Sequence, residues 1–107
     1  MIPEQAVLIV KPGREAQFEQ AFSRAQGIIS AMPGYLSHEL LCCVEQGNRY
    51  LLLVTWNTLE DHTIGFKESG EYQEWKAILH HFYEPFPEVW HFSRRPELSN
   101  LPDQASR

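Results

Sequence analysis

The sequence predicts an α+β domain of the ferredoxin-like class, with element order β-α-β-β-α-β and one antiparallel four-stranded sheet. Three observations support this prediction. Apolar runs of strand length alternate with segments whose apolar residues recur every three or four positions. Turn signals rich in Pro, Gly and Asn separate most of these segments. The second and third strands are joined by only Gln46-Gly47-Asn48, which is typical of a hairpin.

The first half of the chain supplies a strand, a helix and a second strand. Residues 6–10, AVLIV, predict a strand that ends at a Lys-Pro-Gly turn. Residues 14–32 predict an amphipathic helix with one buried stripe. The stripe consists of Phe18, Phe22, Ala25, Ile29 and Met32. Pro33-Gly34 ends this helix, and residues 35–45 predict the second strand.

The second half supplies a strand, a broken helix and a last strand. Residues 49–56 predict the third strand, and Asn57 or Thr58 is expected to cap the helix that follows. Ser69-Gly70 interrupts this helix, so that a second segment is predicted over residues 71–83. Its apolar face would carry Tyr72, Trp75, Leu79 and Phe82. Residues 88–93 predict the fourth strand.

The chain is expected to form one domain over residues 1–93, followed by a polar tail over residues 94–107. A length of 107 residues suits a single domain and is too short for two hydrophobic cores. The tail has two prolines and no periodic pattern. It is therefore expected to be mobile or to be held by a partner.

Composition excludes several classes of partner. The formal net charge of −5 argues against a nucleic-acid ligand, whose phosphates require clustered Lys and Arg. No apolar run approaches the roughly 20 residues that a membrane-spanning helix needs. Cys42 and Cys43 are adjacent, which disfavours a disulfide between them. Together with an N-terminus unlike a secretory signal, this predicts a cytoplasmic protein.

Apolar residues occupy both faces of the predicted sheet. The third strand, YLLLVTW, and the first, AVLIV, contain hardly a polar residue. The second strand would place Leu36 and Leu40 on one face, and Tyr35 and Leu41 on the other. Two helices cover only one face of a sheet, and a large exposed apolar face is unfavourable. We therefore expect a homodimer whose sheets pack face to face.

An ordered set of motifs resembles the antibiotic biosynthesis monooxygenase domain family. The set comprises V-K-P-G-R-E-x-x-F at residues 10–18, P-G-Y at 33–35, Y-L-L-L-V-T-W-x-T-L-E-D-H at 50–62 and P-x-V-x-H-F at 87–92. The resemblance covers residues 4–93 and implies a dimeric α/β barrel. It also implies one of several activities. One branch oxidises anthrone-type polyketides or quinols with O2 and without metal or flavin, another degrades haem, and a third modifies a small signalling molecule.

The resemblance also bears on particular residues. The haem branch has Asn, Trp and His where this chain has Ala6, Phe66 and Lys76, so haem binding is not expected. Many other members carry a His three residues before the Ser that matches Ser69, and here that position is Phe66. His62 lies one helical turn earlier on the same face. Either His62 has taken over the role of that His, or the role is lost.

His62 is the predicted catalytic base, because the ordinary pKa of histidine, about 6.5, suits proton transfer at neutral pH. The alternative is a half-buried histidine bonded to the backbone. Aromatic residues are predicted to line a substrate pocket, although rings at these spacings are also typical of a core. The predicted substrate-binding residues are Trp56, Phe66, Tyr72, Trp75, Phe82 and Trp90.

No metal site or cofactor is expected. His80-His81 are adjacent on a helix, so their side chains diverge. His80 and Glu84 have the spacing of a ligand pair, yet no third ligand stands nearby in the sequence.

Two functions from different classes remain open at this point. The first is a cofactor-independent monooxygenase acting with O2 on a small electron-rich aromatic, quinol or polyketide-like substrate. The second is a non-catalytic dimeric α/β barrel protein that binds a small ligand or serves a structural role. The aromatic, histidine-bearing face favours the enzyme, whereas Phe66 at the position of the family's His favours the binding protein.

Overall fold

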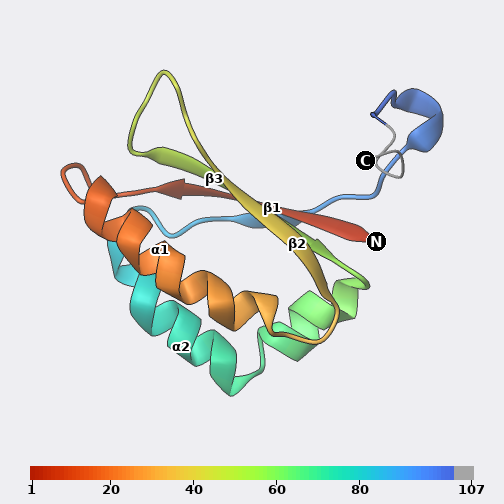
Figure 1. Cartoon of the computed structure of the whole chain (residues 1–107), viewed down its shortest axis with the longest axis horizontal. Helices are drawn as coiled ribbons and strands as arrows, with labels where there is room; N and C mark the ends of the chain where they lie inside the picture. The colour runs from red at the N-terminus through yellow and green to blue at the C-terminus, as the bar shows by residue number, and fades with distance from the viewer. Residues whose placement is uncertain (103–107) are drawn as a thin grey trace.

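Two helices lie on one face of a four-stranded antiparallel sheet in the computed structural model, which describes residues 1–102 (Figure 1). The elements run in the order β1 (Ile2–Ile9), α1 (Glu15–Ser30), β2 (Tyr35–Cys42), β3 (Arg49–Trp56), the π-helical segment η1 (Asp61–Phe66), α2 (Gly70–Leu79), the 3-10 turn η2 (His80–Phe82), β4 (Val89–His91) and the 3-10 turn η3 (Pro96–Leu98). The strand order in the sheet is β2-β3-β1-β4. The predicted ferredoxin-like α+β fold, with its broken second helix, is confirmed.

A glycine turn leads into β2 and connects it to the start of the second helical region. Gly34 has a φ of +83°, which only glycine adopts without strain. Its carbonyl oxygen accepts a hydrogen bond from Asn57 N at 2.7 Å. A Cβ atom at this position would collide with the carboxyl group of Asp61. Gly34 therefore holds the end of β3 and the start of η1 against the α1–β2 turn.

The second helical region starts and breaks at polar side chains. Thr58 Oγ1 accepts from Asp61 N at 3.2 Å, and Asp61 Oδ2 accepts from Thr58 N at 3.0 Å, which forms a reciprocal N-terminal cap. Thr58 is thus the capping residue of the two that were expected. Ser69 Oγ accepts from Tyr72 N at 3.1 Å and starts α2, which confirms the interruption at Ser69-Gly70.

Most boundaries shift by a few residues, β2 ends at Cys42 and β4 spans only Val89–His91, and three further differences bear on the site. β1 begins at Ile2 instead of residue 6, so its first residues belong to the sheet. α2 ends at Leu79 and tightens into η2, instead of continuing to residue 83. The segment after Thr58 is π-helical where an α-helix was expected: Lys67 N donates to His62 O at 3.0 Å, five residues back.

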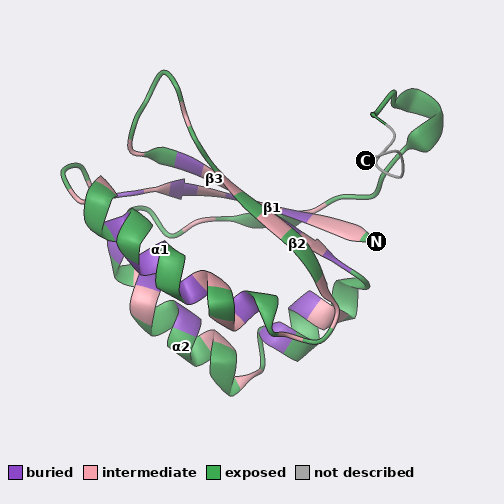
Figure 2. Cartoon of the chain, in the orientation of Figure 1, coloured by how far each residue is buried: buried purple, intermediate pink, exposed green. Residues whose placement is uncertain are grey.

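The two faces of the sheet differ in cover. The inner face packs on the helices and carries the core, and Figure 2 shows buried residues gathered between the two layers. Inner-face residues of β1 and β3 are Glu4, Ala6, Leu8, Tyr50, Leu52, Val54 and Trp56. The outer face has no cover among residues 1–102. Its apolar residues include Val7, Ile9, Leu41, Leu51, Leu53 and Trp90.

The predicted assignment of β2 residues to the two faces of the sheet is wrong at the start of the strand. A bulge lies between Tyr35 and Ser37, so Tyr35 pairs with Trp56 and packs against the core. Leu36 is the extra residue and is exposed, instead of sharing a face with Leu40. The bulge adds one residue to β2. The residue before it, Tyr35, therefore points to the opposite face from the one that simple alternation predicts.

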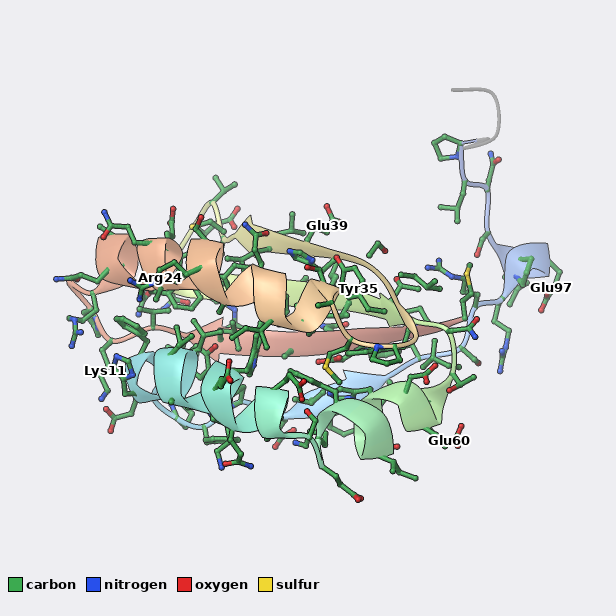
Figure 3. All side chains as sticks on the ribbon, turned by 60° about the horizontal axis from the view of Figure 1, so that its bottom comes forward. Lys11, Arg24, Tyr35, Glu39, Glu60 and Glu97 are labelled. Carbon is green, nitrogen blue, oxygen red and sulfur yellow. The ribbon has the colours of Figure 1, made fainter. Side chains whose placement is uncertain are left out.

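The chain leaves the body of the domain after β4. Residues 94–102 extend away from the sheet in Figure 1, and Figure 3 shows Glu97 on this segment, apart from the two layers. Leu98 and Leu101 of this segment are exposed. The last part of the predicted tail, residues 103–107, lies outside the described residues. None of the helices within residues 1–102 combines the length and the apolar composition needed to cross a bilayer.

Candidate functional site

A cavity lies between the inner face of the sheet and the second helical region. Ala6, Leu8 and Leu52 form its apolar floor, and the helical segments contribute aromatic rings from Phe66 and Trp75. Its volume is about 50 Å³, which is room for a few water molecules. Polar side chains stand at both ends of this apolar space. The cavity is therefore a small, mostly apolar compartment with polar groups only at its ends.

The first end is built around Glu4 of β1. This carboxyl group is buried, with 5% of the residue exposed, because position 4 falls on the inner face. Trp56 Nε1 donates a hydrogen bond to Glu4 Oε1 at 2.8 Å. Burial raises the pKa of Glu4 to about 7, although the Trp56 hydrogen bond and the nearby charge of Lys67 lower it. A carboxyl group of this kind exchanges a proton near neutral pH.

His62 of η1 lies between Glu4 and His91 of β4. Its Nε2 is 3.4 Å from Glu4 Oε1, and its Nδ1 is 2.8 Å from His91 Nε2. The His62 ring stacks on Trp56, with a centroid distance of 5.3 Å. Burial, followed by the charges of His91 and Lys67, lowers the pKa of His62 to about 4. The imidazole is therefore neutral at neutral pH, and Glu4 takes up a proton before His62 does.

The two contacts of His62 differ in kind. Its Nδ1 and His91 Nε2, 2.8 Å apart, share a hydrogen bond whose donor depends on the tautomers of the two rings. Its Nε2 lies 3.4 Å from Glu4 Oε1, close enough for a charge contact but too long for a good hydrogen bond. Glu4 is therefore held by the hydrogen bond from Trp56, with His62 beside it.

The second end of the cavity carries His80, Tyr72 and Tyr83. Among residues 1–102, His80 Nδ1 is the one side-chain nitrogen or oxygen that is fully closed off from solvent and has no hydrogen-bond partner. Its ring packs edge-on against Phe86 at a centroid distance of 4.9 Å. Burial, then the charges of Lys76 and Lys67, lowers the pKa of His80 to about 4, and burial raises that of Tyr83. This end is neutral and offers an unused ring nitrogen to a ligand.

Lys67 stands beside the cavity as an exposed positive charge. Its Nζ donates to the Tyr72 hydroxyl at 3.4 Å and lies 4.9 Å from the centroid of the same ring. The charge of Lys67 acts on both ends, because it lowers the pKa of Glu4, His62 and His80. It therefore favours an anionic form of whatever occupies the space between them.

Glu4, His62 and His91 do not form a metal site. A single ion would need one ring nitrogen from each histidine and the carboxylate to point at a common centre. Here His62 turns one nitrogen toward Glu4 and the opposite nitrogen toward His91. Over the part of the chain that the structure describes, no three His, Cys, Asp or Glu side chains are grouped to hold a metal.

The structure brings together four of the predicted site residues and separates three. His62, Phe66, Tyr72 and Trp75 line the cavity. Trp56 does not line it, but lies behind it in contact with Glu4 and His62.

Phe82 and Trp90 lie elsewhere, which corrects the prediction that they share this pocket. The 3-10 turn at residues 80–82 rotates Phe82 toward Phe18, and their ring centroids are 5.9 Å apart. Trp90 points to the outer face, because its neighbours Val89 and His91 point inward. It is 60% exposed.

Sequence reasoning missed Glu4 and left His80 and His91 without a site role. The signal for Glu4 was the alternation Glu4, Ala6, Leu8, Val10, which extends one face of the first strand toward the N-terminus. His91 was predicted on a strand. The face of the sheet to which it points could not be predicted, because the sequence does not show the register of a three-residue edge strand. His80 entered the sequence argument only through its ligand-like spacing from Glu84, which lacked a third ligand.

Comparisons with known proteins agree with this architecture. A family model described as antibiotic biosynthesis monooxygenase matches residues 1–78. The uncharacterized protein YczJ of Bacillus subtilis (strain 168) is 59% identical over 92 residues, which are 86% of this chain and 97% of that protein.

Solved structures share the fold. An antibiotic biosynthesis monooxygenase family structure from Bordetella bronchiseptica has a TM-score of 0.84 and 32% identity, over 88% of this chain and 96% of that one. SnoaB, a cofactor-independent oxygenase from Streptomyces nogalater, has a TM-score of 0.80 over 95% of this chain and 97% of its own. Its identity is 20%, so this second likeness concerns the fold alone.

Proposed function

This chain belongs to the antibiotic biosynthesis monooxygenase family, and we propose that it is a cofactor-independent monooxygenase for a small electron-rich aromatic, quinol or polyketide-like substrate. The observation that carries the proposal is the pair of buried residues Glu4 and His62, with half-buried His91 bonded to His62, at the end of an aromatic-lined cavity. Such a site supplies what this chemistry asks of a protein: a proton acceptor, a low-polarity space and rings that hold a planar molecule.

The reaction proceeds through the substrate's anion. Loss of a proton makes the substrate electron-rich enough to pass one electron to O2, and the resulting radical and superoxide combine as a peroxide. The peroxide takes up a proton and loses water. One oxygen atom of O2 enters the product as a carbonyl, and the other leaves in water. A hydroquinone plus O2 thus gives a hydroxyquinone plus water.

The site fits each requirement with its own residues. The pair of Glu4 and the predicted residue His62 provides the acid–base centre. Phe66, Tyr72 and Trp75 provide the predicted aromatic contacts to the substrate ring. Lys67 favours the anionic intermediate through its charge. His80 Nδ1 gives a second oxygen on the substrate a hydrogen-bond partner.

The size of the cavity limits the substrate. At about 50 Å³ it is smaller than an aromatic ring, so binding requires side chains at its rim to move. Phe86 is the side chain best placed to move aside, because it lines the cavity and is 65% exposed. Single-ring and two-ring substrates are favoured over larger polycyclic ones.

Oxygen consumption tests the proposal directly. Purified protein is mixed with a panel of hydroquinones and anthrones, O2 uptake is followed, and the product is analysed by mass spectrometry after reaction with oxygen-18-labelled O2. We expect one labelled atom in the product and the other in water. His62→Ala should lower the rate at least tenfold. The absence of uptake above the uncatalysed rate for the whole panel would contradict the proposal.

A second candidate function is ligand binding without turnover. Phe66 favours it, because an almost fully buried phenylalanine, 2% exposed, stands where many members of the family have a histidine. Binding of the same panel without O2 uptake, measured by calorimetry, would select this alternative.

We also propose that two chains pack through their outer sheet faces. Leu51, Leu53, Val7 and Ile9 form a central apolar area on a face that the helices leave bare. Burial of this area between two copies would remove the apolar surface from water. Light scattering should give the mass of a dimer, and Leu51→Glu should give that of the 12.5 kDa monomer. A monomeric wild-type chain at micromolar concentration would refute it.

A further inference from the structure

We propose that Glu4, instead of His62, is the group that receives the substrate's proton, and that His62 is the positioning residue that holds Glu4. This inference rests on the proposed monooxygenase function and names a catalytic residue of the same site. It follows from which polar atoms the protein has already used and which it leaves for a ligand.

His62 is a poorer proton acceptor than Glu4 in this arrangement. Its Nδ1 is hydrogen-bonded to His91 Nε2 at 2.8 Å, whereas Nε2 lies 3.4 Å from Glu4 Oε1, which is too long for a good hydrogen bond. A base must lie within hydrogen-bond reach of the proton that it removes, and it needs a free lone pair there. Nδ1 is taken by His91, and Nε2 faces a carboxyl group that binds a proton more strongly, because the pKa of Glu4 is about 7 and that of His62 is about 4.

Glu4 has one oxygen engaged and one free. Oε1 accepts from Trp56 Nε1 at 2.8 Å and is also the atom that faces His62. No side-chain or backbone donor within residues 1–102 reaches Oε2. Glu4 lines the cavity, so Oε2 is the acceptor that the cluster offers to a bound molecule. Trp56, which does not line the cavity, holds Oε1 from behind, and His62 lies beside the carboxyl group at the cavity wall.

The charges around Glu4 suit this role. His62 of η1, Lys67 directly after η1 and His91 of β4, which pairs with Glu4, are the titratable groups around it, and Trp56 of β3 adds a donor. The imidazoles are neutral at neutral pH, because burial lowers the pKa of both. Burial raises the pKa of Glu4 to about 7, so the carboxylate both accepts and returns a proton under working conditions.

The proton follows a closed route. The O–H or C–H bond of the substrate breaks, its electron pair stays on the substrate, and the proton passes to Glu4 Oε2. The substrate anion gives one electron to O2, and the radical pair combines to a peroxide anion. Glu4 then returns the proton to the peroxide, which loses water and forms the carbonyl product. Glu4 is ionised again at the end, and O2 is the only oxidant.

Glu4→Gln tests the assignment without a turnover assay. The amide oxygen of the new side chain must accept from Trp56 Nε1, so its NH2 group takes the place of Oε2. A donor then replaces an acceptor in the cavity, and a negative charge is removed. A ligand that donates a hydroxyl should bind more weakly, and its anion should bind more tightly.

The probe is 4-nitrophenol, a single-ring phenol whose ionised form has its own absorbance band. Its binding is measured across a pH series, which gives the affinity ratio of phenol to phenolate. In Glu4→Gln this ratio should shift toward phenolate at least tenfold. Glu74→Gln is the matched control, because Glu74 is an exposed glutamate of α2 that does not line the cavity, and there the ratio should stay the same. Circular dichroism confirms that both variants are folded.

Three results decide between the outcomes. A ratio that changes less than threefold in Glu4→Gln overturns the assignment, as does a wild-type protein that does not bind 4-nitrophenol. With an oxidised substrate, Glu4→Gln should lower kcat/KM about 100-fold and remove the midpoint near neutral pH from its profile, whereas His62→Gln should keep that midpoint.

The turnover assay distinguishes failure of this inference from failure of the proposed function. If no substrate in the panel is oxidised but the 4-nitrophenol ratio shifts, the monooxygenase proposal fails and Glu4 stands as the ligand's proton acceptor. If substrate is oxidised and Glu4→Gln keeps its rate within threefold, the monooxygenase proposal stands and the Glu4 assignment fails.

Discussion

Each face of β1 departs from the usual distribution of polar and apolar residues: the covered face carries a charged residue, and the uncovered face carries apolar ones. The inner face, which the helices cover, carries a glutamate between buried apolar residues: Glu4 precedes Ala6 and Leu8. The outer face, which nothing covers among residues 1–102, carries Val7 and Ile9. Charged residues are seldom buried, and large apolar areas are seldom left in water.

Each exception has a cost that folding alone does not explain. A buried carboxyl group destabilises the fold, because the domain would gain from an apolar residue of similar size at that position. An open apolar face promotes association with any apolar surface. The comparison teaches that the two exceptions call for different explanations: the inner one is consistent with the proposed site chemistry, and the outer one with the proposed packing of two chains. Both can be tested by paired substitutions on neighbouring residues.

The largest effect is expected from core truncation on the inner face. Leu52→Ala should lower the free energy of unfolding by about 2–5 kcal/mol, because Leu52 is 4% exposed and its loss leaves a void. Leu51→Ala, on the outer face, should cost less than half as much in the monomer. Urea denaturation of dilute protein measures both. Equal costs for the two leucines would show that the outer face is covered within one chain.

The pH dependence of stability sharpens the comparison next. Glu4 has a folded-state pKa of about 7 against an ordinary 4.5, so between these values the folded chain binds a proton that the unfolded chain has lost. This contribution is complete below pH 4.5 and is lost as pH rises through 7. Relative to Glu4→Gln, wild-type stability should therefore fall by about 3 kcal/mol over this window.

The comparison with Glu4→Gln is needed because His62 acts in the opposite sense. Its pKa is lowered to about 4, so its contribution to stability is lost as pH falls from 6.5 toward 4. Denaturant titrations of both proteins at a series of pH values give the difference curve, in which the His62 contribution is common to the two. A flat difference curve would show that Glu4 is not buried as an acid.

A smaller effect is expected at the far end of the cavity. His80→Phe removes a buried ring nitrogen without a partner, and should raise the free energy of unfolding by about 1 kcal/mol. It should also weaken binding of a ligand that has a second oxygen, such as hydroquinone, more than binding of phenol. Thermal unfolding and calorimetry measure the two effects. A destabilised His80→Phe protein would indicate that the nitrogen is satisfied by water.

The smallest effect is expected from the outer-face glutamate. Glu39→Gln should change the free energy of unfolding by less than about 0.5 kcal/mol, because Glu39 is exposed and has no ion pair among residues 1–102. Ligand binding should stay within twofold of wild type. A large loss on this substitution would mean that the contrast between Glu4 and Glu39 does not depend on the face of the sheet.

The sequence was sufficient for the fold because its signals are local. The stripe on α1, the turn at Gly34 and the break at Ser69 each depend on residues close together in the chain. The order of these elements then limits the topology to the ferredoxin-like class.

The site was only partly predictable because it depends on single-residue shifts. The spacing within each helical segment pairs His62 with Phe66 and Tyr72 with Trp75, and all four line the cavity; their roles in binding and catalysis stay predictions. Phe82 does not line the cavity, because α2 ends in a 3-10 turn that changes the direction of its side chain. Trp90 was lost because a three-residue edge strand shows no clear alternation in the sequence. Glu4 was missed because the strand was started four residues too late.

β4 makes the contact between His62 and His91 depend on the shortest pairing in the sheet. β1 and β3 pair along eight residues each, whereas β4 pairs with β1 only through Val89, Trp90 and His91. His91 lies at the end of this edge strand, where few hydrogen bonds hold the backbone. Opening of the β4 edge would therefore separate His91 from His62 while β1, β2 and β3 stay paired.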